Sequence, residues 1–261
     1  MTMDDSLLYE VTENIATITI NRPERRNALA RDTILRIGDA VDRAQADAEV
    51  RVVVLTGAGT QAFSAGADLK EADERAKAGL PMPHPMTGPH RNVFERVLEV
   101  TKPTVAALNG DAIGGGCELA IACDLRIAAA HARIAMPEAK RGLGANFGSV
   151  MLPRLIPRAL ALELLYTGRT ISADEALGMG LINRVLPSDG FAVAARAYVA
   201  EIAGNAPLTL QRYKHMALKG WELPIATALR LDAGPNPYAS EDRIEGVRAL
   251  VEKRKPVWQG R

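Results

Sequence analysis

A turn with three consecutive glycines carries the strongest signal for chemistry in this chain. The segment Asn109-Gly-Asp-Ala-Ile-Gly-Gly-Gly-Cys-Glu118 lies between an apolar run and the start of a helical pattern. Glycines permit unusual dihedral angles and leave the first N–H groups of the following helix free to face a ligand. On the glycines alone, the turn is either a cradle for an oxyanion or a tight strand-to-helix connection.

Glu118 favours the first interpretation of this turn. It stands in the first turn of the helix, and the following residues Leu119-Ala-Ile-Ala-Cys123 offer it no charged partner. A carboxylate that only balances the helix dipole would serve equally well on a solvated face. Because this helix is apolar on nearly all sides, we expect Glu118 to be a buried, unpaired carboxyl with a raised pKa, as acid–base chemistry near neutral pH requires.

Two further segments could take part in the same chemistry. The turn Phe63-Ser-Ala-Gly-Ala-Asp-Leu-Lys70 follows a buried strand, and its small residues let a ligand approach the backbone. A second carboxyl, Glu138, lies twenty residues beyond Glu118 and directly after a proline. Taken alone, Glu138 could equally be an ordinary glutamate at the N-terminus of a helix.

The elements that must position these residues alternate between strands and helices. β-Branched and apolar runs predict strands, and apolar residues at helical spacing predict helices. The predicted strands are 15–20, 50–55, 104–108, 125–128 and 182–185, and the predicted helices between them are 28–48, 90–99 and 117–123. This alternation predicts an α/β fold.

Beyond Pro187 the pattern contains helices only, at about 191–204, 207–220, 223–231 and 240–252. We therefore divide the chain into an α/β core, residues 1–190, and a C-terminal helical region, residues 191–261. The helical region is short for an independent domain, so we expect it to pack on a neighbouring subunit as well as on its own core.

The composition excludes several classes of protein. The chain has 261 residues, 48% of them hydrophobic, and 32 Lys+Arg against 31 Asp+Glu give a net charge of +1. Such a balance provides no overall attraction for nucleic acid or for an anionic membrane. No apolar run is long enough to span a membrane, and the acidic N-terminus is unlike a signal peptide. With two cysteines whose helical spacing is too long for a disulfide, a cytoplasmic protein is expected.

Taken together, the motifs identify a resemblance to a known family. Asn21-Arg-Pro23 with Asn27-Ala-Leu29, Ser64-Ala-Gly-Ala-Asp-Leu69, Gly114-Gly-Gly-Cys-Glu118, Pro137-Glu138 and Glu252-Lys-Arg-Lys-Pro256 resemble the crotonase superfamily of enoyl-CoA hydratases and isomerases. The match covers nearly the whole chain in order. It implies a spiral of ββα units with a C-terminal helical region, assembled as a homotrimer or a dimer of trimers.

The resemblance also implies roles for individual residues. Ala67 and Gly115 match the two positions whose backbone N–H groups polarise the thioester oxygen of an acyl-CoA, and charge develops on that oxygen during the reaction. The residues implied to bind the CoA part of the substrate are Arg26, Ala28, Ala65, Asp68, Leu69, Lys70 and Gly114. Coenzyme A belongs to the substrate, so no separate cofactor is expected.

Glu118 and Glu138 match the two glutamates of true hydratases, which hold a water molecule on one face of the double bond. In that pattern Glu118 activates the water and Glu138 delivers a proton to the α-carbon. The implied activity is hydration of a 2-enoyl-CoA in lipid and fatty acid metabolism. Two alternatives stay open: an isomerase or thioester hydrolase of the same superfamily, and a protein that binds CoA thioesters without turnover.

The chain departs from the usual hydratase pattern at Gly142-Leu-Gly-Ala-Asn-Phe-Gly-Ser149. Asn146 and Phe147 stand where small residues are usual, and this turn borders the acyl pocket in the family, so substrate size is expected to differ. The glycine spacing does not fit the fingerprint of a dinucleotide-binding turn. The four histidines are scattered, and no metal site is expected.

The segment from about Asp73 to His90 is predicted to be a loop, since Ala78-Gly-Leu-Pro-Met-Pro-His-Pro-Met-Thr-Gly-Pro-His90 holds four prolines and two glycines. It is interpreted either as a lid that closes over the acyl group or as an ordinary surface loop. Met82 and Met86 could form the floor of an acyl tunnel or simply provide apolar cover.

Overall fold

The fold contains two sheets. The structure is a computed structural model that describes residues 6–80 and 91–261. The larger sheet has six strands in the order β1 (Leu7–Thr12), β2 (Ile15–Ile20), β3 (Val52–Gly57), β5 (Thr104–Leu108), β7 (Leu125–Ala129) and β10 (Arg184–Leu186). The smaller has four, in the order β4 (Ala62–Ser64), β6 (Asp111–Ile113), β8 (Arg133–Ala135) and β9 (Thr170–Ser172).

Successive strands alternate between the two sheets. The chain passes from β3 to β4, from β5 to β6 and from β7 to β8, so that each step adds one parallel strand to each sheet. Helices follow these pairs, as the expected spiral of ββα units requires. Among the strands of the described residues, the pairings of β1 with β2 and of β8 with β9 are antiparallel, and the others are parallel.

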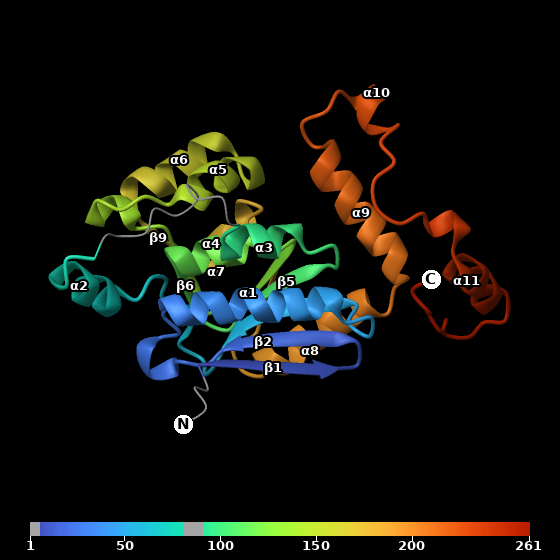
Figure 1. Ribbon diagram of the computed structural model, residues 1–261, viewed down its shortest axis with the longest axis horizontal. Helices are drawn as coiled ribbons and strands as arrows, with labels where there is room; N and C mark the ends of the chain where they lie inside the picture. The colour runs from blue at the N-terminus through green and yellow to red at the C-terminus, as the bar shows by residue number, and fades with distance from the viewer. Residues whose placement is uncertain (1–5, 81–90) are drawn as a thin grey trace.

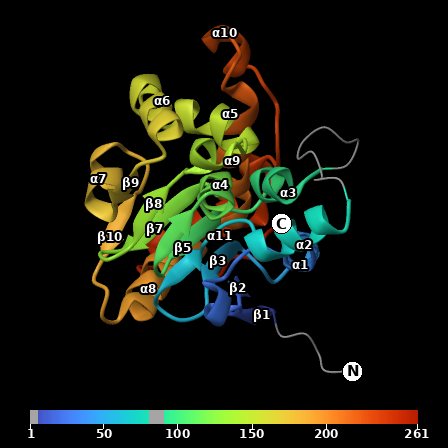
Figure 2. The ribbon, with the colours of Figure 1, turned by 90° about the vertical axis from the view of Figure 1, so that its left-hand side faces the viewer.

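The helices surround the sheets on several sides (Figure 1). In Figure 2, α5 and α6 lie above the strands and α8 lies below them. The helices are α1 (Arg31–Ala46), α2 (Leu69–Lys77), α3 (Val93–Glu99), α4 (Gly115–Ala122), α5 (Asn146–Leu155), α6 (Arg158–Thr167), α7 (Ala173–Gly178), α8 (Phe191–Ala203), α9 (Pro207–Gly220), α10 (Ile225–Ala228) and α11 (Glu241–Val251). Three short 3-10 helices are η1 (Pro23–Arg25), η2 (Glu138–Arg141) and η3 (Pro237–Ala239).

The six-stranded sheet is buried on both faces, because successive side chains of a strand point to opposite sides. In β2, Ala16, Ile18 and Ile20 pack with α1 and α4 in the main core. The opposite face packs against α8, whose buried residues recur every fourth position, at Phe191, Ala195, Val199 and Ala203. The residues of α8, up to Ala203, therefore pack directly against the six-stranded sheet.

Several predicted elements match the structure, and one does not. Strands 15–20 and 104–108 are confirmed residue for residue, and the helix predicted at 117–123 is α4. The prediction of a loop from Asp73 is wrong for residues 73–77, which belong to α2. The helix forms there because the Asp68 side chain caps it, accepting hydrogen bonds from the N–H groups of Lys70 and Glu71. Residues 81–90, with Met82 and Met86, lie outside the described residues.

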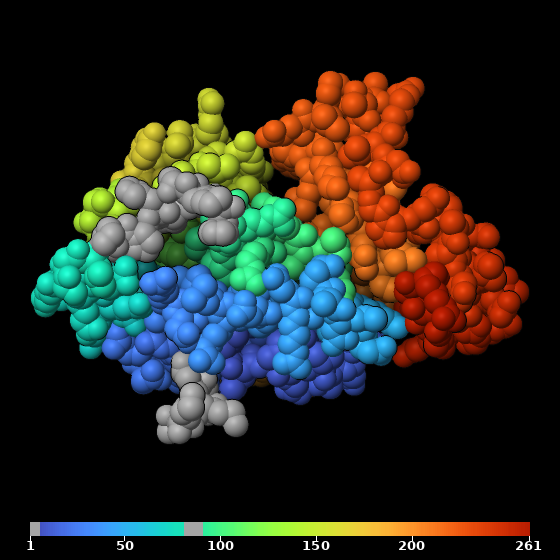
Figure 3. Space-filling model, viewed as in Figure 1, coloured from blue at the N-terminus to red at the C-terminus, as the bar shows by residue number. Residues whose placement is uncertain are grey.

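Residues 207–261, from α9 to the chain end, stand away from the core and are called the C-terminal arm (Figures 1 and 3). Lys214 of α9 attaches the arm to the sheets: its ammonium group lies 2.8 Å from Asp124 Oδ2 and is nearly buried. Asp124 in turn accepts hydrogen bonds from the N–H and the hydroxyl of Thr104 in β5. No helix in residues 6–80 and 91–261 is both long and apolar enough to cross a membrane.

We expect Lys214→Met to lower the free energy of unfolding by about 2 kcal/mol, because it leaves the half-buried Asp124 carboxylate without its counter-charge. Urea denaturation measures the change. Lys219→Met is the matched control, since Lys219 is exposed on the same helix, and it should alter stability by less than about 0.5 kcal/mol. Equal effects of the two substitutions would contradict a structural role for the ion pair.

Candidate active site

The turn that carries Ala67 is bonded to the segment before α1. Ala65 N–H donates to Arg26 O, Leu29 N–H donates to Gly66 O, and Asp68 N–H donates to Leu29 O. Leu29 and Ala67 thereby form a parallel bridge outside the named strands. The backbone around Ala67 is therefore held by hydrogen bonds on both sides of this residue.

Gly66 and Gly115 bring the two turns predicted from sequence into contact. Gly66 has a φ of +81°, and a methyl group on it would lie 2.5 Å from Ile113 O and 3.0 Å from Gly115 N. A methyl group on Gly115 would lie 3.8 Å from Ala67 N. Only glycine permits the approach at position 66. The structure thus brings together Ala67 and Gly115, as the sequence analysis expected of an oxyanion hole.

The N–H groups of Ala67 and Gly115 are available to a ligand. Within residues 6–80 and 91–261, neither group donates to a backbone or side-chain acceptor. Gly115 is the first residue of α4, where a helical N–H has no partner within its own helix. Two fixed donors side by side can bind one oxygen atom on which negative charge develops.

Glu118 lies in the first turn of α4 and is 7% exposed. Burial raises its pKa to about 7, and the nearby charge of Glu138 adds to the effect, while backbone hydrogen bonds oppose it. The raised pKa and the burial of α4 agree with the sequence analysis. The sequence analysis did not anticipate that Glu118 Oε1 accepts a hydrogen bond of 2.8 Å from the N–H of Gly148.

Glu138 begins η2, directly after Pro137, and approaches the same turn. A methyl group on Gly114 would lie 2.8 Å from Glu138 Oε1, and Gly114 O accepts the N–H of Glu118. Burial raises the pKa of Glu138. Its Oε2 atom is buried and has no hydrogen-bond partner among the described residues, which marks a polar position that a water molecule or substrate atom would satisfy.

The carboxyl groups of Glu118 and Glu138 both lie near the thiol of Cys117. Burial raises the pKa of its thiol far above the usual range, and the charges of Glu138 and Glu118 raise it further. Cys117 and Cys123 are free and buried, as expected from their spacing. A buried thiol with a raised pKa is chemically inert, so Cys117 serves as packing beneath the carboxyl pair.

The residues implied to bind CoA differ in their exposure. Arg26, Leu69 and Lys70 are exposed around the turn, where a ligand can reach them. Asp68 instead has a buried carboxylate occupied by protein groups: Arg22 and Arg25 lie 3.0 and 2.6 Å from its oxygens, and it caps α2. Burial alone would raise the pKa of Asp68, but the hydrogen bonds from Arg22 and Glu71 and both arginine charges lower it. The Asp68 carboxylate therefore has a structural role.

Three other positions implied by the resemblance are less accessible. Ala28 is buried and its carbonyl accepts a hydrogen bond from Arg22, while Ala65 is half-buried and bonded to Arg26. Gly114 is buried and has a φ of +57°, so it shapes the turn between β6 and α4. These three residues build the backbone of the site.

Phe147 and Asn146 begin α5, beside Glu118. Asn146 is exposed, whereas Phe147 is 3% exposed and packs on Phe94 of α3 with ring centroids 5.4 Å apart. A methyl group on Gly148 would approach both Met136 and, at 3.4 Å, Glu118 Oε1. An apolar wall made of Phe94, Met136 and Phe147 therefore stands next to the carboxyl group.

The sequence analysis missed three residues of this site. Gly148 orients Glu118, yet a backbone donor thirty residues away leaves no trace in spacing. Phe94 appeared only as part of a helical pattern. Asn27 lay within a quoted motif, and its burial at 0% exposure with a positive φ was not anticipated. A buried asparagine in a turn is a signal that could have been used, because its amide must find partners.

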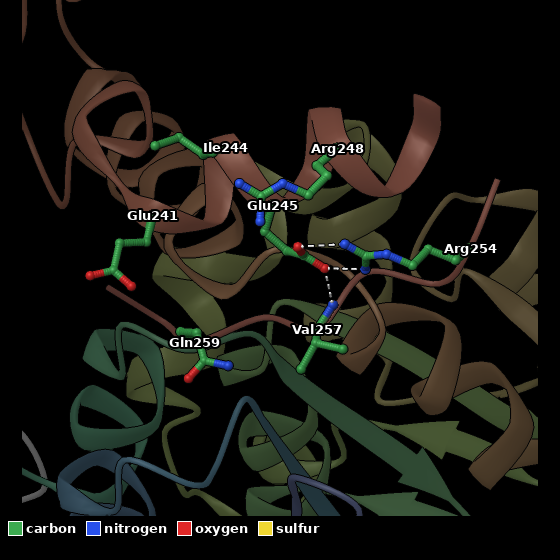
Figure 4. Close-up of a pocket in the computed structure, with 7 residues that line it drawn as sticks. All are labelled: Glu241, Ile244, Glu245, Arg248, Arg254, Val257 and Gln259. Atoms are coloured by element: carbon green, nitrogen blue, oxygen red, sulfur yellow. Dashed lines mark hydrogen bonds and ion pairs between the residues drawn. The ribbon is translucent and has the colours of Figure 1, made fainter. Parts of the chain in front are cut away.

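A separate pocket of about 510 Å³ lies in the C-terminal arm (Figure 4). The lining residues are Glu241, Ile244, Glu245, Arg248, Arg254, Val257 and Gln259. Glu245 accepts hydrogen bonds from Arg254 and from Val257 N–H, which lower its pKa to about 2. These groups fasten the last residues to α11. No group of three metal-ligating side chains occurs in the described part of the chain.

The geometry around Glu118 defines the class of protein. Two N–H donors that can face one oxygen and two carboxyls with raised pKa values are the groups that an enzyme needs to stabilise an oxyanion and to transfer protons next to it. Consistent with this, residues 10–261 match the family described as enoyl-CoA hydratase/isomerase. The chain belongs to this family.

Similar proteins cover almost the whole chain. A short-chain-enoyl-CoA hydratase of Clostridium acetobutylicum is 36% identical over 96% of both chains, and a carnitinyl-CoA dehydratase of Citrobacter koseri is 38% identical over 99% of this chain and all of its own. A crystal structure of an enoyl-CoA hydratase from Bacillus anthracis superposes with a TM-score of 0.88, at 34% identity over 98% of this chain and all of that one. The predicted crotonase-type fold is confirmed.

The raised pKa of Glu118 predicts how stability depends on pH. In the unfolded chain the carboxyl titrates near 4.5 and in the folded protein near 7, so the folded state binds the proton more tightly. This tighter proton binding stabilises the folded state by up to about 3 kcal/mol. The contribution is fully present below pH 4.5 and is lost as pH rises through 7. We therefore expect Glu118→Gln to be more stable than the wild type at pH 8 and to lose this advantage at pH 5.

Urea denaturation at the two pH values measures the difference. Glu201→Gln, at an exposed position of α8, is the control and should show no such pH-dependent gain. A Glu118→Gln variant with the same relative stability at both pH values would contradict the raised pKa.

Proposed function

We propose that this chain is an enoyl-CoA hydratase, which adds water across the double bond of a 2-enoyl-CoA to give a 3-hydroxyacyl-CoA. The observation that carries the proposal is the presence of a buried carboxyl, Glu118, and a half-buried one, Glu138, both with raised pKa values, beside two free backbone donors. Several relatives are named as hydratases or dehydratases of CoA thioesters, including the crotonyl-CoA hydratase of Syntrophomonas wolfei. The substrate supplies the coenzyme A, and we propose that no other cofactor takes part.

The two N–H groups polarise the thioester. When the carbonyl oxygen accepts hydrogen bonds from Ala67 and Gly115, electron density moves from the double bond toward this oxygen, and the β-carbon becomes electrophilic. The enolate that forms after attack carries its negative charge on the same oxygen. Preorganised donors stabilise that charge more than they stabilise the neutral substrate, which lowers the barrier.

The two carboxyls complete the addition of water. Glu118 uses Oε1 to accept the Gly148 N–H, so Oε2 is left to take a proton from water as the water oxygen bonds to the β-carbon. Glu138, whose pKa is raised by burial, acts in its protonated form and gives its proton to the α-carbon as the enolate returns its electron pair to form the C–H bond. A proton shift from Glu118 to Glu138 then restores the starting state.

The exposed residues around the first turn fit the CoA part of the substrate. We propose that Arg26 and Lys70 face its phosphates and that Leu69, which is 49% exposed, lies against its adenine. Arg26 and Lys70 supply positive charge at the site itself, so the protein needs no overall positive charge to bind the phosphates. We also propose a cytoplasmic location and a place in lipid metabolism, where acyl-CoA esters are intermediates.

Replacing each carboxyl by an amide tests the mechanism. We expect Glu118→Gln and Glu138→Gln each to lower kcat by about 10² or more with little change in CoA-ester affinity, because the amide keeps its size but cannot exchange a proton. Since the two groups act on one water, the double variant should be reduced far less than the product of the single effects. The loss of enoyl-thioester absorbance measures turnover.

The same experiment separates the alternatives. An isomerase needs one proton-transferring group, so one substitution would be nearly silent in an isomerisation assay. A non-catalytic binding protein would show no turnover before any substitution. Full hydratase activity in Glu138→Gln would refute the mechanism.

The apolar wall beside Glu118 sets the size of the acyl group that fits. Because Phe147 and Phe94 fill the space next to the carboxyl, we propose short 2-enoyl groups as the preferred substrates. Phe147→Ala should raise kcat/KM for a ten-carbon substrate relative to a four-carbon substrate by about tenfold or more. Phe191→Ala, a similar deletion on the buried face of α8, is the control and should leave this ratio unchanged.

We further propose that the chain assembles as a homotrimer or a dimer of trimers. Its accessible surface is 14301 Å², against about 11,000 Å² expected for a compact monomer of 28.0 kDa. Many of the exposed large apolar side chains lie on the C-terminal arm, which projects from the core in Figure 3. The most exposed of these side chains are Ile225, Leu229, Tyr238, Leu250 and Val251.

Sedimentation velocity tests the assembly. The wild type should sediment as a trimer or hexamer at micromolar concentration, and Ile225→Glu with Leu229→Glu should shift it toward the monomer, because two charges would be buried in an apolar interface. Leu35→Glu, at an exposed position of α1, is the control. A monomeric wild type would contradict the proposal.

A further inference from the structure

Asn27 is a fully buried polar residue whose hydrogen-bonding groups are all occupied. Its side-chain oxygen accepts the N–H of Arg22 at 3.0 Å, and its side-chain amide donates to Ala58 O at 3.0 Å and Ala62 O at 2.7 Å. Its own N–H donates to Arg22 O, and its carbonyl accepts the hydroxyl of Ser64. A core packing role alone would not require an asparagine with every group engaged.

The partners of Asn27 belong to the segments that carry Ala67. Ser64, which donates to Asn27 O, also accepts the N–H of Gly66 at 3.2 Å, and Gly66 directly precedes Ala67. Asn27 itself has a φ of +55°, a left-handed conformation that its network must hold in place. The position of the Ala67 N–H therefore depends on Asn27 through the Ser64 hydroxyl and the turn at Gly66.

Asn109 holds the other turn in a matching way. It is 7% exposed and begins the segment that leads to Gly115. Its side-chain oxygen accepts the N–H of Gly57, and its side-chain amide donates to Gly59 O and to Ala62 O at 3.2 Å. Ala62 O, at the start of β4, thus accepts hydrogen bonds from both asparagines.

We infer that Asn27 and Asn109 are positioning residues that set the separation of the Ala67 and Gly115 N–H groups by sharing the carbonyl of Ala62. The inference rests on the proposed function, since it concerns the oxyanion hole of that reaction. Neither side chain belongs to the reacting groups. Each acts through the backbone of the turn that it holds, and a displacement of either donor by a fraction of an ångström weakens stabilisation of the developing charge.

The test uses a substrate analogue that reports polarisation directly. An aryl enoyl-CoA with a dialkylamino group on its ring absorbs at longer wavelength when its thioester carbonyl is polarised, and such a probe can be bound to the whole protein. We expect Asn27→Ala and Asn109→Ala each to lose most of the red shift seen with the wild type. Both should lower kcat by about 10- to 100-fold for a short 2-enoyl-CoA, with KM changed less than about threefold.

Because the two asparagines act on one carbonyl, the double variant should lose far less than the product of the single losses. Val199→Ala is the stability control: Val199 is a buried residue of α8, which packs on the far face of the six-stranded sheet, and its side chain forms no hydrogen bond, so the substitution destabilises the protein while the hydrogen bonds of both asparagines stay in place. It should keep the red shift and kcat. If Asn27→Ala does not fold, Asn27→Ser, which retains a small polar group, is measured with Asn109→Ala.

The outcomes separate the inference from the proposed function. A wild type that neither hydrates a 2-enoyl-CoA nor shifts the probe would overturn the proposed function. A wild type that does both, with asparagine variants that keep the red shift or behave like Val199→Ala, would overturn the positioning role alone. A reduced red shift with reduced kcat in the asparagine variants, and with neither in Val199→Ala, supports it.

Discussion

The site depends on the close approach of two turns that lie almost fifty residues apart in the chain. Gly66 sits so near Ile113 O and Gly115 N that no side chain can occupy it. The approach is possible because β4 and β6 are neighbours in the four-stranded sheet, which places the turns that follow them side by side. Without this close approach, the N–H groups of Ala67 and Gly115 would still have no acceptor, but they would not point toward one atom.

The same arrangement explains why two carboxyls are tolerated inside the protein. A buried carboxyl close to another is unfavourable when both are ionised, and the protein reduces this penalty by letting the pKa values rise. Glu118 also gains the Gly148 N–H, which supports its ionised form. The site is therefore less stable than an apolar core of the same shape would be, as is common where stability and activity compete.

How far the sequence predicts this structure depends on the length of each pattern. Longer runs of apolar and β-branched residues, such as 15–20 and 104–108, predict strands, because five or six residues are enough to show the pattern of a strand. Strands β4, β6 and β8 have three residues each and show no period, so the second sheet was not predicted from the residues. It was implied only by the resemblance.

The candidate site shows the same division. Ala67, Gly115, Glu118 and Glu138 could be identified because they stand in short motifs that can be read directly from the sequence. Gly148, Phe94 and the hydrogen bonds of Asn27 could not, since they depend on contacts between segments distant in sequence. For Asp68 the motif led to a CoA-binding role, whereas the structure shows a structural role. Its carboxylate caps α2 and pairs with Arg22, so its oxygens are already occupied by protein groups.

Helix α4 is held at both ends, and the two anchors face different parts of the molecule. At its start Gly114 N–H donates to Ala135 O, which fixes the turn that carries Gly115. Just beyond its end Asp124 pairs with Lys214 of the C-terminal arm. A displacement of the arm therefore acts on the same helix that carries Glu118. The Glu118 carboxyl and the C-terminal arm are thus connected through one short helix.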